Sequence, residues 1–222
     1  MKFLLATCSV LYTVFLMSTS TLVGAEPQPK FFTSVKLLYQ DEFHGGQLDL
    51  NHWQVRQGTT WKIQDGVLAG SPSPKEYQEK KVAEGDKAHA GFKPVIWLEK
   101  VPENLLVQFR VRFDAKAYQP KFPLIDVGHH VNSLMFSENG LTLVLKKDQK
   151  TIEAKEISLP LNTWADVIIE LKRGAMRLQV NNKQVTFEDP LIDMVGQQQI
   201  DFKGIDHGGI QIDDVKVYEG IP

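Results

Sequence analysis

The sequence predicts an all-β fold in which two antiparallel sheets stack into a sandwich, and two observations support this prediction. First, apolar and polar residues alternate with period two nearly everywhere after Ser34, as in strands that bury one face. In residues 105–113, for example, Gln108, Arg110 and Arg112 fall on the face opposite the apolar side chains. Second, short turn signals of the hairpin type separate these runs. They are Asp65-Gly66, Asn139-Gly140, Arg173-Gly174 and Asn181-Asn182.

Alternation and turn chemistry together place the strands in order along the chain. So many strands in one domain imply two stacked sheets, and the short turns make consecutive strands antiparallel neighbours. The expected strands cover residues 35–40, 53–56, 61–64, 67–70, 95–98, 105–113, 124–127, 134–136, 141–146, 151–157, 166–172, 176–180, 183–187 and 210–218.

Two stretches depart from the strand pattern. Residues 71–91 are polar, rich in lysine and glutamate, and contain Pro72 and Pro74. They predict a long surface loop of the kind that often contributes to function. Residues 191–199 follow Pro190 and predict either a short helix or an irregular crossover.

The first 25 residues predict a secretory signal peptide. Lys2 precedes a mostly apolar run, and Val23-Gly24-Ala25 offers the small residues that a signal peptidase requires. Residues 26–222 are then expected to form a single domain that is secreted, or that resides in the periplasm or cell envelope. The apolar run is too short to cross a bilayer, so no membrane span is expected. Cys8 is the chain's one cysteine and lies in this signal, which excludes disulfides and thiolate chemistry from the mature chain.

Composition and missing motifs exclude several classes of function. The 222 residues include 25 Lys+Arg and 27 Asp+Glu, with a formal net charge of -2. Because no basic block stands out, nucleic acid is not an expected partner. The sequence contains no glycine-rich phosphate loop, no His-Glu-x-x-His and no Gly-x-Ser-x-Gly. Nucleotide hydrolysis, zinc proteolysis and the lipase mechanism therefore have no support.

Histidines form the first group of candidate functional residues. His89 ends the polar stretch, and His129 and His130 follow a predicted strand. Since adjacent side chains of a strand point to opposite faces, only one of this pair is expected to share a site with His89. An imidazole exchanges a proton near neutral pH, and Asp126 is placed to orient it. The alternative is that each is a structural or surface histidine.

Aromatic residues form a second group, because sugars stack their apolar faces on flat rings. Trp97 and Tyr77 are the rings expected at an exposed site. On the polar face of residues 105–113, Gln108 and Arg112 either line a groove or meet solvent.

Acidic residues form a third group. Asp41 and Asp214, with backbone carbonyls near Gly45-Gly46, are candidates for a structural Ca²⁺ site, because calcium takes oxygen ligands. The alternative is that these are solvated carboxylates at strand ends.

A further set of sequence motifs is similar to those of one known family. With the elements Asp41-Glu42-Phe43, Leu48-Asp49 and Trp53, and the run Trp61-Lys62-Ile63-Gln64-Asp65-Gly66-Val67-Leu68, the sequence resembles the secreted concanavalin A-like jelly rolls of the 3-keto-disaccharide hydrolase type. These are distantly laminarinase-like, and the resemblance extends over residues 37–218. It implies a two-sheet antiparallel jelly-roll sandwich. The laminarinase-type pair of glutamates flanking an aspartate is absent, which disfavours two-carboxylate hydrolysis.

The resemblance implies activity on oxidised glycosides. A ketone at C3 acidifies the C2 proton, so His89 or His130 is expected to abstract it and eliminate the glycosidic oxygen. Asp126 would orient this base, and Arg110 would stabilise the enolate. Two other functions stay open. One is a non-catalytic carbohydrate-binding module that acts through its exposed rings, and the other is a cell-envelope interaction protein without a sugar ligand.

Overall fold

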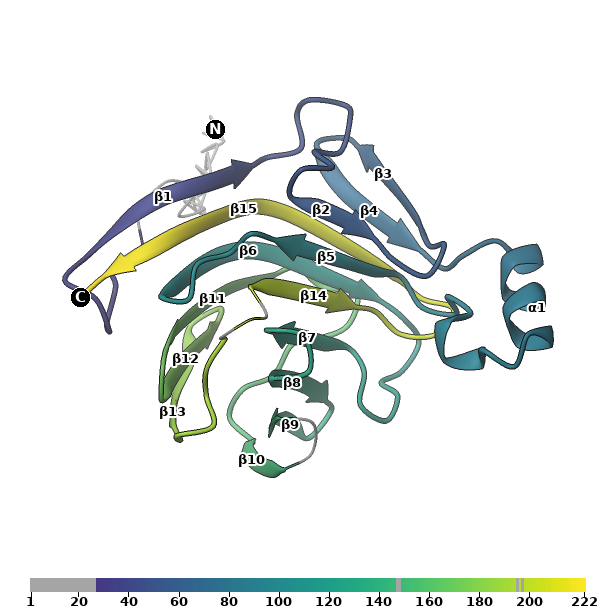
Figure 1. Ribbon diagram of the computed structural model, residues 1–222. Helices are drawn as coiled ribbons and strands as arrows, with labels where there is room; N and C mark the ends of the chain where they lie inside the picture. The colour runs from purple at the N-terminus through teal and green to yellow at the C-terminus, as the bar shows by residue number, and fades with distance from the viewer. Residues whose placement is uncertain (1–26, 147–148, 195, 197) are drawn as a thin grey trace, which may run out of the picture.

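The protein is built from two antiparallel β-sheets stacked face to face (Figure 1). The computed structural model describes residues 27–146, 149–194, 196 and 198–222. The predicted fold class, a two-sheet antiparallel sandwich, is confirmed. The predicted signal peptide and Cys8 lie outside the described residues and stay predictions. Within the described part of the chain, no helix is long and apolar enough to cross a membrane.

One sheet has eight strands. They are β1 (Ser34–Asp41), β3 (Thr60–Gln64), β4 (Val67–Ser71), β6 (Leu105–Asp114), β11 (Ala165–Lys172), β12 (Ala175–Val180), β13 (Lys183–Glu188) and β15 (Gly209–Ile221). Their order is β13-β12-β11-β6-β15-β4-β3, and β1 also pairs with β15. The long strand β15 therefore lies beside β6, although about half of the chain separates them in sequence.

The other sheet has seven strands. They are β2 (Trp53–Val55), β5 (Val95–Glu99), β7 (Leu124–Val127), β8 (Asn132–Ser137), β9 (Gly140–Leu145), β10 (Lys150–Ala154) and β14 (Gln199–Lys203). Their order is β10-β9-β8-β7-β14-β5-β2. Strand β14 enters between β5 and β7 from a distant part of the chain. Such long connections between neighbouring strands are typical of a jelly roll.

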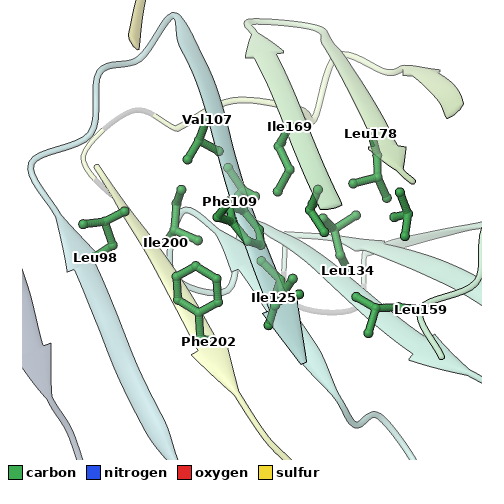
Figure 2. Packing of buried hydrophobic residues seen from close by; sticks show 14 of the residues in the cluster. Leu98, Val107, Phe109, Ile125, Leu134, Leu159, Ile169, Leu178, Ile200 and Phe202 are labelled. Atoms are coloured by element: carbon green, nitrogen blue, oxygen red, sulfur yellow. The ribbon is translucent and has the colours of Figure 1, made fainter. Parts of the chain in front are cut away.

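The core lies between the two sheets and consists of the apolar residues that alternation predicts (Figure 2). Phe109 of β6 meets Phe202 of β14 edge to face, with ring centroids 5.1 Å apart. Ile125 and Ile200 complete this contact from the seven-stranded sheet, and each is fully buried. Burial of such side chains contributes about 1.5–3 kcal/mol each, which explains why the apolar face of each strand turns inward.

The predicted hairpin turns occur with one shift. Asp65 and Gly66 join β3 to β4 with φ values of 52° and 74°, which is the backbone that a type I′ turn requires. Turns also form at Arg173-Gly174 and Asn181-Asn182. In the β8–β9 hairpin, Ser137 pairs with Gly140. The turn residues there are therefore 138 and 139, one position before the expected pair.

Three expectations about local structure are corrected. Residues 71–91 are not a plain loop, because they contain α1 (Lys75–Ala83) and the 3-10 turn η1 (Lys87–His89). Helix α1 buries no residue, so it has no apolar face for the sequence to reveal, and its lysine, glutamate and glutamine residues favour a helix by propensity alone. The short helix considered for residues 191–199 is absent from the described part of that stretch, and strand β14, which begins at Gln199, was not predicted.

Gly91 fixes the segment that leads from η1 into β5. Its φ is +70°, and a Cβ there would lie 2.3 Å from the carbonyl oxygen of Gln57. We expect Gly91→Ala to destabilise the protein by about 2–3 kcal/mol. Alanine is strained at this positive φ, and its Cβ would clash with the carbonyl oxygen of Gln57. Urea denaturation measures this. Gly85→Ala is the control, since Gly85 has φ +80° but no atom within 4 Å of its added Cβ. If both variants lose the same stability, the close approach to Gln57 contributes nothing.

Candidate functional site

A cavity of about 490 Å³ lies on the outer face of the seven-stranded sheet, away from the core. Strands β5, β7, β8, β9 and β14 form its floor, and the chain around η1 and the ends of β2 and β7 form its walls. Its volume is in the range of pockets that bind small molecules. Its lining includes Arg56, His89, Lys93, Trp97, Lys121, Phe122, His129, His130, Ser133 and Lys203.

Strand register places the polar side chains of the floor in one row. Asp201 of β14 is the Cα partner of Trp97 on one side and of Asp126 on the other, and Asp126 pairs in turn with Ser133 of β8. Paired residues of neighbouring strands project to the same face. Since Ile125 and Phe202 point into the core, the four residues of this row point to the cavity side.

Two buried aspartates and one lysine form the base of the cavity. Asp126 and Asp201 are fully buried. The Nζ atom of Lys203 donates to Asp126 Oδ2 and lies 3.1 Å from Asp201 Oδ2. Ser133 Oγ donates to the other oxygen of Asp126, and Gln199 donates to Asp201 Oδ1 at 2.7 Å. Each carboxylate is thus hydrogen-bonded and faces a cation, as buried charges require.

His129 is held by Asp201. Its Nδ1 lies 2.7 Å from Asp201 Oδ2, and its ring centroid lies 5.0 Å from that of Trp97. Because a carboxylate only accepts hydrogen bonds, the proton is on Nδ1. In the neutral imidazole, Nε2 is then the nitrogen with the free electron pair. An aspartate that fixes the tautomer of a histidine in a cavity is an arrangement suited to a general base.

His130 lies beside His129, with the two rings tilted at 48°, and forms no hydrogen bond to an acid among the described residues. The ring centroids lie 4.0 Å apart, and His130 Nδ1 is 3.9 Å from Asp126 Oδ2, which is too long for a hydrogen bond. Asp126 therefore does not orient His130 as expected from the sequence. The expectation that only one histidine of the pair faces the site is also wrong. Both residues lie in the β7–β8 turn, where His130 has φ 60°, and strand alternation does not apply to a turn.

Burial, followed by the charges of Lys203 and His129, lowers the pKa of His130 below its ordinary value of 6.5. The unfolded chain then binds this proton more tightly than the folded chain. We expect the free energy of unfolding to fall as pH drops below the unfolded value of 6.5 and through the lower folded value. An NMR titration should place the His130 midpoint below that of the chain in urea. Between about pH 7.5 and about pH 5.5, the free energy of unfolding should fall less in His130→Gln than in the wild type. An equal loss in both proteins would contradict this.

His89 lines the same cavity from η1. Its Nδ1 lies 2.6 Å from Asp86 Oδ1, and this hydrogen bond lowers the pKa of Asp86. The side chain of His89 is 65% exposed, so it forms the solvent-facing wall of the cavity. The structure therefore brings His89, His129 and His130 together, and two of the three are paired with an aspartate.

Trp97 also lines the cavity, but its ring is partly covered. The guanidinium of Arg56 lies over the ring at 3.9 Å from its centroid, and the indole Nε1 is buried without a hydrogen-bond partner. Tyr77 does not belong to the described lining. Its ring packs against Gly58, where a Cβ would lie 2.7 Å from the nearest ring carbon. The second ring proposed from the sequence therefore packs α1 against Gly58, outside the described cavity lining.

The other sheet holds three of the predicted site residues. Gln108, Arg110 and Arg112 lie on β6, on the outer face of the eight-stranded sheet. Arg110 lies over the Trp164 ring and is 3.4 Å from Asp213. The core separates this face from the histidines, so the assignment of Arg110 as stabiliser of an enolate beside His130 is corrected. The sequence shows which face of a strand is polar, but not which sheet the strand joins.

The residues proposed for calcium have protein partners. Asp41 accepts hydrogen bonds from Tyr39, Phe43 and Trp53, and Asp214 lies 3.6 Å from Arg110. Neither residue belongs to a group of three possible ligands within the described chain. A calcium site at Asp41 and Asp214 stays a prediction.

One group has the spacing of a metal site. Donor atoms of Asp126, His129 and Asp201 lie within 4.8 Å of one another. The ammonium group of Lys203 already lies against both carboxylates, so a protein cation neutralises this group.

The sequence analysis does not single out several residues of the site, among them Arg56, Ser133, Asp201 and Lys203. The signal for two of them is present in Ile200-Asp201-Phe202-Lys203, where apolar and charged residues alternate as in a strand with one polar face. Arg56 and Ser133 carry no such signal, since their place beside the cavity depends on strand pairing.

The fold is that of a concanavalin A-like jelly roll, and comparison with solved structures agrees. The similar structures include a cellulose-induced protein, Cip1, with a TM-score of 0.59 at 14% identity over 81% of this chain and 96% of that chain. An endo-β-galactosidase from Clostridium perfringens gives 0.58 at 13% identity over 89% of this chain and 66% of that chain. The endo-β-1,3-glucanase from Pyrococcus furiosus gives 0.52 at 12% identity over 84% and 95%. At these identities the likeness establishes the fold alone.

The sequence itself matches no protein-family model and no curated protein. The solved structures support the jelly-roll fold, and membership of the 3-keto-disaccharide hydrolase family stays a prediction.

Proposed function

We propose that this protein is a secreted carbohydrate-active enzyme that cleaves 3-keto-glycosides by proton abstraction and elimination. The observation that supports this most directly is the convergence of three imidazoles on one cavity, two of them hydrogen-bonded to aspartates. Solved jelly rolls of similar shape include an endo-β-galactosidase and an endo-β-1,3-glucanase. That likeness makes a sugar the first ligand to test.

The proposed first step is removal of the C2 proton by His129. Asp201 holds the Nδ1 proton, so Nε2 accepts the proton that leaves C2. The electrons of the C2–H bond form an enolate with the C3 ketone. Collapse of the enolate forms the C1–C2 double bond and breaks the bond from C1 to the glycosidic oxygen. A positioned general base that acts in this way contributes about 100- to 10,000-fold.

The proposed stabiliser of the enolate is Lys203, in place of Arg110. Its side chain is 11% exposed and lines the cavity, so its charge acts where little water screens it. His89 is proposed to give a proton to the departing oxygen. It is exposed at the wall, where a leaving group exits, and Asp86 holds its ring through Nδ1.

The alternative of a non-catalytic binding module is less well supported. Such a module needs an exposed ring on which a sugar stacks. Arg56 lies over Trp97, and Tyr77 is packed on Gly58. Neither ring that the sequence suggested is presented as an open platform.

The test is release of the aglycone from a 3-keto-glucoside by the purified protein, with the unoxidised glucoside as control substrate. We expect turnover of the ketone only. His89→Gln should slow release of a basic leaving group by about tenfold or more and should have little effect on a nitrophenol, which needs no acid. An inactive wild-type protein that is folded and binds the sugar would instead support the binding module.

A further inference from the structure

The cavity differs in charge from the rest of the molecule. The ionisable residues of its described lining are Arg56, Lys93, Lys121, Lys203 and the three histidines, and no aspartate or glutamate is among them. The whole chain has a formal net charge of -2. A concave surface lined by one sign of charge concentrates ligands of the opposite sign.

Two of these four cations already have carboxylate partners. Lys203 lies against Asp126 and Asp201, which are buried beneath the lining. Lys93 lies 2.9 Å from Asp206. Arg56 and Lys121, by contrast, form no ion pair with any carboxylate in the described part of the chain. Arg56 and Lys121 therefore bring two positive charges that no carboxylate pairs, whereas the base of the cavity, with two carboxylates and one ammonium, has one formal negative charge.

Arg56 is held in a fixed orientation. Its guanidinium lies 3.9 Å from the centroid of the Trp97 ring, and Nη1 donates to Gln54 Oε1 at 3.0 Å. Stacking on an aromatic ring fixes the guanidinium plane. The remaining N–H groups form a planar fork that matches two oxygens of a carboxylate or a sulfate.

We propose that the cavity selects saccharides that carry an anionic group, a carboxylate or a sulfate, and that Arg56 binds this group. This rests on the proposed function only in taking the ligand to be a sugar. Arg56 is thus a specificity residue, while His129 and Lys203 act on the bonds that change. Lys121, an exposed residue of the lining, adds charge without a defined geometry.

The experiment measures binding of three oligosaccharides of one length and linkage by calorimetry. They are a neutral gluco-oligosaccharide, an oligoglucuronate and a sulfated gluco-oligosaccharide, and the last two separate the carboxylate from the sulfate. We expect at least one anionic sugar to bind about 10- to 100-fold more tightly than the neutral one. Arg56→Gln should remove this preference, and Arg56→Lys should keep part of it. Arg173→Gln is the matched control, because Arg173 is an exposed arginine in the β11–β12 turn.

The outcomes separate this proposal from the proposed function. Equal binding of all three sugars would overturn the anionic selectivity and leave a sugar site in place. An anionic preference that survives Arg56→Gln, with the variant folded by circular dichroism, would overturn the role of Arg56. If none of the three sugars binds, the anionic selectivity is overturned, while turnover of the 3-keto-glucoside decides the proposed function separately.

Discussion

Replacing His129 with glutamine is expected to lower turnover of a 3-keto-glucoside by about 100- to 10,000-fold. The glutamine keeps a hydrogen-bond donor near Asp201 but has no nitrogen that accepts a proton at neutral pH. The same variant should lose exchange of the C2 proton with deuterated water, which reports proton abstraction before any bond to the leaving group breaks. His89→Gln should retain this exchange. NMR of the substrate measures it directly.

The control for this prediction is His52→Gln. His52 also forms a hydrogen bond to an aspartate, with Nδ1 2.8 Å from Asp49 Oδ2, but it stacks on Tyr39 and is not part of the described cavity lining. We expect this variant to keep turnover within about twofold of the wild type. If His129→Gln exchanges the C2 proton at the wild-type rate, His129 is not the base, and His130 becomes the residue to test.

Replacing Lys203 with methionine is expected to destabilise the protein by about 3–5 kcal/mol. The ammonium group lies against Asp126 and Asp201, both fully buried on adjacent strands. Without it, two carboxylates face one another away from water. Urea denaturation measures the loss. Protonation of one carboxylate relieves the repulsion, so the deficit should shrink as the pH is lowered.

Two variants control this second prediction. Lys93→Met removes an ammonium that pairs with Asp206, whose side chain is 36% exposed, and it should cost about 0–1 kcal/mol. The double variant Asp126→Asn with Lys203→Met should recover part of the lost stability, because one uncompensated charge is gone. A loss in Lys203→Met as small as that in Lys93→Met would show that the buried aspartates need no cation.

The strands could be predicted because their signals are local. Alternation in β6 depends on neighbours along the chain, and the Asp65-Gly66 turn depends on the backbone freedom of two residues. Helix α1 could not be predicted from periodicity, since it buries no residue. Strand β14 was missed because it is only five residues long and follows an irregular segment.

The candidate site could be predicted only in part. His89 and the His129-His130 pair stand out because they follow polar or glycine-containing segments at the ends of predicted strands or of the predicted loop. The partners of these histidines could not be found in the same way. Asp201 is 72 positions away from His129 in sequence, and nothing in the residues between them indicates that they meet.

By itself, the sequence determined the all-β class, the two-sheet sandwich and the polar face of each strand, because these follow from periodicity and turn chemistry. Only the tertiary structure decided which polar faces meet. The insertion of β14 between β5 and β7 brings Asp201 and Lys203 beside Trp97 and Asp126, whereas β6 takes Arg110 to the opposite sheet. The order of the strands depends on the burial of the whole core. That burial is a sum over residues far apart in the chain, so no local pattern reveals it.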